Sequence, residues 1–131
     1  MLVSEVIICV DDEKEILEIL QRQLMTMFGQ SFEYEFAESG EEALELIQEL
    51  ETEHNTQVRL VISDWSMPGI KGDELILRLK ESRPEIKTLL LTGQAPEDIL
   101  TKVCASGSSN CMLKPWDRES LKERIQLLMA S

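Results

Sequence analysis

Short runs of apolar residues recur along the chain and alternate with longer amphipathic stretches. Residues 6–10 form a continuous, largely β-branched run that ends at two acids, which is typical of a strand buried on both faces. The run at residues 59–63 has the same character, whereas residues 32–37 alternate between apolar and polar positions. The pattern predicts five strands, at residues 6–10, 32–37, 59–63, 86–91 and 110–113.

The stretches between these strands have helical spacing. Over residues 13–27 the apolar side chains recur every three or four positions and form one stripe. Ser39 and Glu42 have the spacing of a capping box, Pro96 suits the first turn of a helix, and Asp117 suits an N-cap. The pattern predicts five helices, at residues 13–27, 39–50, 73–81, 96–105 and after residue 117.

Five strands that alternate with five helices indicate an α/β fold, in which helices cover both faces of a parallel sheet. Because the crossover connections are right-handed, the carboxyl ends of all the strands share one edge. Ligand sites in open α/β sheets form at that edge, where the order of the strands reverses. Functional residues are therefore expected directly after each strand.

Length, composition and charge narrow the class of protein. The chain has 131 residues, 43% of them hydrophobic, which suits one globular domain over residues 1–131. It has no apolar run near the ~20 residues of a membrane helix, and its first residues do not form a signal peptide, so we expect a cytoplasmic protein with no membrane partner. The formal net charge of −12 argues against direct binding to nucleic acid.

Polar residues at the predicted strand ends carry the candidate chemistry. Asp11 and Asp12 follow the first strand, Asp64 follows the third, Thr92 the fourth and Lys114 the fifth. Each has a structural explanation when taken alone, as a helix cap, a turn residue or a solvated charge. Their shared position at one edge of the sheet is what indicates a site.

These residue types suit phosphoryl transfer. Three neighbouring carboxylates repel one another unless a cation neutralises them. Oxygen ligands suit Mg²⁺, and no cysteine or histidine follows these strands to favour zinc. An aspartate can act as a nucleophile and form an aspartyl phosphate, while a lysine and a hydroxyl group can meet the phosphoryl oxygens.

The sequence resembles the receiver domain of two-component response regulators, and is similar to the single-domain chemotaxis member of that family. The resemblance rests on residues 11–12, 63–69, 91–93 and 114–116, in this order and at strand ends, and it extends over essentially the whole chain. It implies a flavodoxin-like, doubly wound five-stranded parallel sheet in the order 2-1-3-4-5, with five helices.

The resemblance also implies a metal site and a phosphoacceptor. Asp64 would accept the phosphoryl group. Asp12 and Asp64 would bind Mg²⁺ directly, and Asp11 would act mainly through water. The backbone carbonyl of Ser66 would be a further ligand, so the metal would not need that side chain.

Four other positions match residues with known roles in the family. Lys114 would pair with the phosphoryl group, and Thr92 would turn its hydroxyl group to a phosphoryl oxygen. Gly93 would leave room for the phosphodonor. Pro115 would follow the peptide bond that is usually cis in this family.

The function implied by the resemblance is a phosphorylation-dependent signalling switch. The chain would accept a phosphoryl group from a histidine kinase or a phosphotransfer protein, change its affinity for an output protein or domain, and dephosphorylate itself. This is single-turnover self-modification, so a conventional enzyme is not expected. The surface of the fourth helix, fifth strand and fifth helix would be the candidate surface for a homodimer.

The cysteines add one departure from the family pattern. Cys9, Cys104 and Cys111 lie in apolar stretches without a metal-binding spacing, so we expect buried free thiols. The family often has an aromatic residue at the position of Cys111, and its rotation follows that of the threonine. Because a thiol is too small to act in this way, we expect a muted or differently routed change in the fourth helix, fifth strand and fifth helix.

Three other hypotheses use the same residues. A phosphatase of the haloacid dehalogenase type would need a second acid at Ser66, and would turn over a phosphate ester. A flavodoxin-like flavin protein would need a phosphate-binding loop where residues 11–13 are acidic, and would be coloured. An unphosphorylated interaction module is favoured only by Cys111.

Overall fold

A single parallel sheet forms the centre of the molecule. The computed structural model describes residues 3–53, 55–93, 97–98 and 109–130. Its five strands lie in the order β2-β1-β3-β4-β5, which confirms the predicted order. They are β1 (Ser4–Val10), β2 (Glu33–Ala37), β3 (Thr56–Asp64), β4 (Lys87–Thr92) and β5 (Ser109–Leu113).

Four of the predicted helices are confirmed. They are α1 (Lys14–Phe28), which runs into the short 3₁₀ helix η1 (Gly29–Ser31), α2 (Gly40–Thr52), α3 (Gly72–Ser82) and α5 (Arg118–Ala130). The helix predicted at residues 96–105 lies outside the described residues, apart from residues 97 and 98. Within the described ranges, no helix is both long and apolar enough to cross a membrane.

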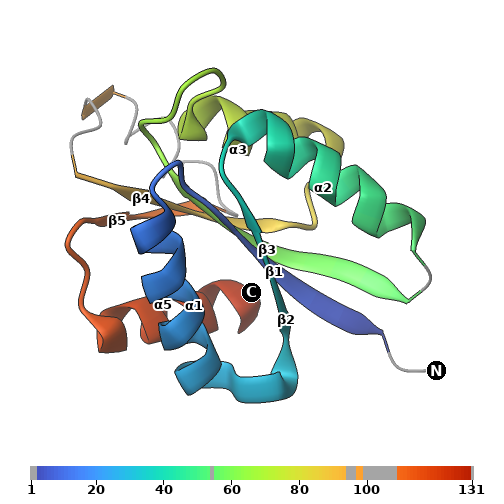
Figure 1. Ribbon diagram of the computed structural model, residues 1–131, viewed down its shortest axis with the longest axis horizontal. Coiled ribbons are helices and arrows are strands. Elements are labelled where there is room, and N and C mark those ends of the chain that lie inside the picture. The colour runs from blue at the N-terminus through green and yellow to red at the C-terminus, as the bar shows by residue number, and fades with distance from the viewer. Residues whose placement is uncertain (1–2, 54, 94–96, 99–108, 131) are drawn as a thin grey trace.

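The helices cover both faces of the sheet. Figure 1 shows α2 and α3 on one face, and α1 and α5 on the other. Along β1, Val6, Ile8 and Val10 pack into the core beneath α2 and α3, while Ile7 and Cys9 pack toward α1 and α5. All five side chains are at most 1% exposed, which explains why residues 6–10 of this strand are all apolar.

The cysteines follow the sequence expectation only in part. Cys9 is a buried free thiol, and burial raises its pKa far above the ordinary value. Cys111 is half-buried and disulfide-bonded, so the expectation of a free thiol is wrong at this position. Hydropathy along the chain indicates burial, but it does not indicate which thiols a fold brings into bonding distance. Cys104 lies outside the described residues.

Candidate functional site

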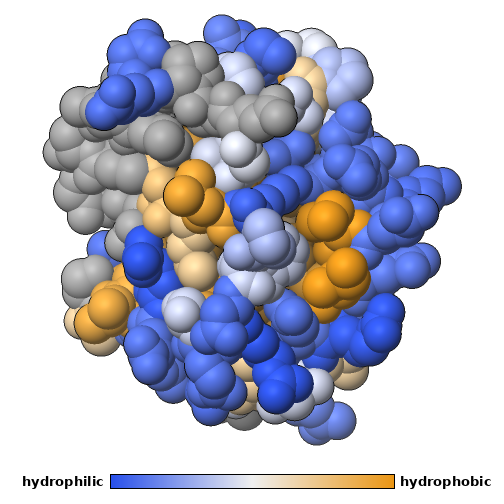
Figure 2. Space-filling view, turned by 90° about the vertical axis from the view of Figure 1, so that its left-hand side faces the viewer, coloured by the Kyte–Doolittle hydropathy of each residue, from blue (hydrophilic) through white to orange (hydrophobic). Residues whose placement is uncertain are grey.

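The register of the sheet brings the predicted site residues to one edge. Val10 lies beside Ser63 in β3, so Asp11 and Asp64 occupy neighbouring positions where these strands end. Thr92 pairs with Leu113, which places Lys114 directly beyond β5. Figure 1 shows the carboxyl ends of the strands together at the left of the view. Figure 2 faces this end, and its described surface is largely hydrophilic with separate hydrophobic patches.

Three carboxylates form the centre of the site. Asp11, Asp12 and Asp64 each offer an oxygen atom, and these oxygens all lie within 4.8 Å of one another. Asp11 is 1% exposed and Asp64 is 7% exposed, whereas Asp12 reaches solvent. Asp11 is held from both sides, because its backbone amide donates to the Ala37 carbonyl and its Oδ1 accepts from the Glu13 amide at 2.8 Å.

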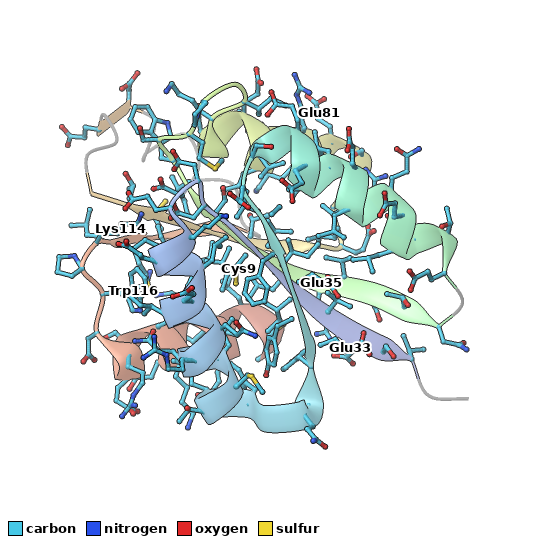
Figure 3. The ribbon with its side chains drawn as sticks, viewed as in Figure 1. Cys9, Glu33, Glu35, Glu81, Lys114 and Trp116 are labelled. Atoms are coloured by element: carbon cyan, nitrogen blue, oxygen red, sulfur yellow. The ribbon has the colours of Figure 1, made fainter. Side chains whose placement is uncertain are left out.

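Lys114 joins the two buried carboxylates. Its Nζ lies 3.1 Å from Asp11 Oδ2 and 3.1 Å from Asp64 Oδ1. Its backbone amide donates to the carbonyl of Thr92 at 2.9 Å, so the lysine is also fixed to the end of β4. Figure 3 shows Lys114 at the carboxyl end of the sheet. The peptide bond between Lys114 and Pro115 is cis, as the resemblance implied.

Burial and charge oppose each other within this group. Burial raises the pKa of Asp11, while the Glu13 amide and Lys114 offset part of the rise and the charge of Asp64 adds to it. Burial alone would lower the pKa of Lys114, but the charges of Asp11 and Asp64 and its hydrogen bonds to both outweigh burial, so the pKa is raised. The lysine therefore remains a cation throughout the neutral range.

The carboxylates open onto a shallow pocket. Its volume is about 400 Å³. The predicted phosphoacceptor lines it, together with acidic residues and the basic Lys114. Thr92 lies in it although this residue is only 1% exposed. The lining residues are Asp12, Glu13, Asp64, Trp65, Ser66, Thr92, Gly93 and Lys114.

Most of the predicted site residues meet at this pocket. Asp11 is not in the lining and contacts Lys114 from the buried side. Pro115 lines a neighbouring, more apolar pocket with Trp116 and Ile16. Cys111 is also apart, because it packs against the cluster of Ile76 and Leu90 beneath β4 and β5.

Glu13 belongs to the site, although its sequence position favours an exposed helix face. It is the N-cap residue of α1, its amide donates to Asp11, and it lines the pocket. The signal that could have found it is its place directly after the two aspartates at the end of β1. Trp65 also lines the pocket, where sequence alone leaves open whether it covers the site or packs at its edge.

The donor set fits a divalent cation. Two buried carboxylates and one exposed carboxylate meet a single lysine ammonium group, so the residues around the pocket carry excess negative charge. Their oxygens are hard ligands, and the exposure of Asp12 leaves room for water. Mg²⁺ is the cation that such an incomplete oxygen cage suits.

Comparisons with known proteins agree with this geometry. Residues 7–126 match the model of the response regulator receiver domain. The phosphate regulon transcriptional regulatory protein PhoB of Rhizobium meliloti is 30% identical over 125 residues, which cover 93% of this chain and 51% of that protein. This chain thus spans about half the length of that relative. The chemotaxis protein CheY of Pseudomonas aeruginosa is 27% identical over 123 residues, 92% of each chain.

A solved structure shows the same architecture. The signal receiver domain of an HD domain-containing protein from Pseudomonas fluorescens Pf-5 superposes with a TM-score of 0.83. It is 26% identical, and the match covers 99% of this chain and 90% of that one. The match to the family model extends over nearly all of the sheet and its helices. The chain therefore belongs to the family of response regulator receiver domains.

Proposed function

We propose that this receiver domain is a Mg²⁺-dependent phosphorylation switch with Asp64 as its phosphoacceptor. Receiver domains act in two-component signalling and interact with histidine kinases and output domains. The observation that carries the assignment of Asp64 is the position of its carboxylate. It lies in the open pocket, 3.1 Å from the Lys114 ammonium group and within reach of two further carboxylates.

The carboxylates of Asp11, Asp12 and Asp64 and the Ser66 carbonyl would hold the cation. Bound there, Mg²⁺ supplies positive charge that neutralises the phosphoryl oxygens. An oxygen of Asp64 would attack phosphorus, and a bond from phosphorus to oxygen would form as the donor's bond from phosphorus to nitrogen breaks. The donor histidine would leave as a neutral imidazole after it takes up a proton.

Lys114 and Thr92 would bind the transferred group. The Lys114 ammonium group already lies against Asp64, so little movement is needed for it to pair with a phosphoryl oxygen. The Thr92 hydroxyl group would turn toward another oxygen. Gly93 would keep the entrance open, because the nearest atom to a Cβ at this position would be Lys114 Cβ at 4.0 Å. Pro115 would fix the turn that follows the lysine.

The consequence of phosphorylation would be altered binding to an output protein or domain, ended by autodephosphorylation. This is self-modification within one domain, residues 1–131, and not turnover of a substrate. The donor would be a histidine kinase or phosphotransfer protein in the cytoplasm. The surface around β5 and α5 would be the candidate for a homodimer. In the described part of this surface, Leu113 is 65% exposed and Leu127 is 68% exposed.

Acetyl phosphate tests the phosphoacceptor directly. With Mg²⁺, the wild type should gain the mass of one phosphoryl group, and Asp64→Asn should gain none, because an amide is not a nucleophile toward phosphorus. Asp117→Asn is the matched control. This variant also replaces a carboxylate with an amide, but at a residue outside the pocket. Asp117 caps α5 by accepting a hydrogen bond from the Ser120 amide. Equal labelling of Asp64→Asn and the wild type would refute the assignment.

A further inference from the structure

Trp65 connects the pocket to the packed interior behind it. This half-buried residue follows Asp64 directly and lines the pocket together with Asp64 and Ser66. Its side chain also packs against the buried cluster of Ile76 in α3 and Leu90 in β4. A movement of Trp65 would therefore affect both the pocket and this buried cluster.

Three consecutive residues at the start of α3 hold Trp65. The Gly72 amide donates to the Trp65 carbonyl at 3.0 Å, and the indole Nε1 donates to Asp73 Oδ1 at 2.9 Å. The Lys71 Nζ lies 5.1 Å from the centroid of the indole ring, within the range of a cation–π contact.

These contacts restrict the main chain at Ser66. On one side of Ser66, Trp65 is bonded through both its carbonyl and its side chain. On the other side, Met67 is only 3% exposed and packs into the core beneath α2 and α3. The Ser66 side chain itself is exposed. The direction of the Ser66 carbonyl is therefore set by its two anchored neighbours.

We propose that Trp65 is a positioning residue for the cation site. By bonding to Asp73, its indole group holds the Ser66 carbonyl in the direction in which it completes the set of Mg²⁺ ligands. This inference rests on the proposed function, which makes that carbonyl a ligand. It adds a role for two residues, Trp65 and Asp73, that would not touch the metal.

Mg²⁺ titrations of the whole chain, followed by two-dimensional amide NMR spectra, test the proposal. Asp73→Ala removes the acceptor and should raise the dissociation constant for Mg²⁺ about fivefold, the effect of one lost hydrogen bond. Asp73→Asn keeps an oxygen acceptor and should stay within about twofold of the wild type. Trp65→Phe should resemble Asp73→Ala, and the double variant should bind no more weakly than either single variant.

Glu74→Ala is the matched control for charge. Glu74 is an exposed acid in the same first turn of α3, and its ion-pair partner is Arg78. Removing it should leave the dissociation constant within about twofold. If Asp73→Asn or Glu74→Ala weakens binding as much as Asp73→Ala does, the effect is electrostatic and the proposal is wrong. Thermal unfolding of each variant identifies any loss of the fold.

Two failures can be told apart. If the wild type binds Mg²⁺ and Asp64→Asn does not, the cation site stands. Unchanged binding by a folded Asp73→Ala would then overturn the positioning role alone. If the wild type shows no saturable binding, or Asp64→Asn binds equally well, the proposed function fails and the positioning role fails with it.

Discussion

At the scale of single residues, burial and the charge of Lys114 act on the pKa of Asp11 in opposite directions. It is buried and faces another carboxylate, although Lys114 and the Glu13 amide stabilise its charge. The net result is a raised pKa, so the folded protein holds the ionised form less well than the unfolded chain does. At pH values above its folded pKa, the ionised Asp11 therefore lowers the free energy of unfolding. The same buried negative charge favours the binding of a cation.

Asp11→Asn should be more stable than the wild type at neutral pH without divalent cations. Asparagine keeps an oxygen for the Glu13 amide and removes the buried charge. The advantage should shrink as the pH falls through the raised pKa of Asp11, because the wild-type carboxyl group then becomes neutral. Urea unfolding in EDTA over a series of pH values measures this difference.

Asp12→Asn provides the control, because the side chain of Asp12 is exposed. It should give a smaller gain, because the charge that it removes is already in contact with solvent. A less stable Asp11→Asn at neutral pH would mean that the ion pair with Lys114 outweighs burial, and would contradict a raised pKa of Asp11.

The rule that sites follow parallel strands predicts which residues meet, but not how they are held. Asp11, Asp64, Thr92 and Lys114 could be found because each lies at, or directly after, the end of a recognisable strand. The bond from Trp65 to Asp73 could not be found in this way, since it depends on the path of the loop between them.

At the scale of elements, the start of α3 lies against the end of β3. A Cβ at Gly72 would collide with the Asp64 carbonyl oxygen, which is backbone and cannot move independently of the strand. It would also meet Leu90 Cδ1 at 2.8 Å. Glycine at this position lets the helix begin close to Asp64.

Gly72→Ala should therefore lower the free energy of unfolding by about 2–3 kcal/mol, the cost of overpacking a tight site. Gly93→Ala is the control, because a Cβ there would lie no closer than 4.0 Å to Lys114 Cβ. Its effect should be within about 0.5 kcal/mol. Chemical denaturation measures both, and equal stability of the two variants would contradict the contact.

The periodicity of apolar residues predicted which segments are helices and which are strands more completely than it predicted the residues at which they begin and end. β3 begins at Thr56, three residues before its predicted start, because polar residues there pair with Ser4 and Glu5 at the edge of the core. Hydropathy does not indicate such pairing. The register also shifts between Val6 and Ile7, and Arg59 beside the shift bonds to Glu5 at 2.8 Å.

The disulfide bond of Cys111 affects the conformational change that is expected in β5. A disulfide-bonded cysteine cannot swing between pockets as an aromatic ring does, so the expected muted or rerouted change at β5 and α5 stays a prediction. The fourth helix, where the rest of that change was expected, lies outside the described residues.

At the scale of the whole molecule, charge is the dominant feature. The net charge of −12 comes from 25 acids and 13 bases, so the folded protein repels itself while attracting cations. Self-repulsion favours the expanded, unfolded chain, and salt screens it.

Raising NaCl from about 0.01 M to about 0.15 M shortens the screening length from about 30 Å to about 8 Å. In EDTA, the midpoint of thermal unfolding should rise by a few degrees, the shift that about 1 kcal/mol gives in a small domain. Scanning calorimetry at several salt concentrations measures it. A constant or falling midpoint would show that self-repulsion does not limit stability.

Trp65 lines the pocket, so its fluorescence can report directly whether the site binds Mg²⁺ and a phosphoryl group. Mg²⁺ and then beryllofluoride, a phosphoryl mimic, are titrated while tryptophan fluorescence is recorded. Trp116→Phe isolates the signal of Trp65, because these are the two tryptophans of the chain. A saturable, Mg²⁺-dependent response that is lost in Asp64→Asn is predicted. No response in the Trp116→Phe protein, together with no mass gain from acetyl phosphate, would contradict a phosphorylation switch and favour an unphosphorylated interaction module.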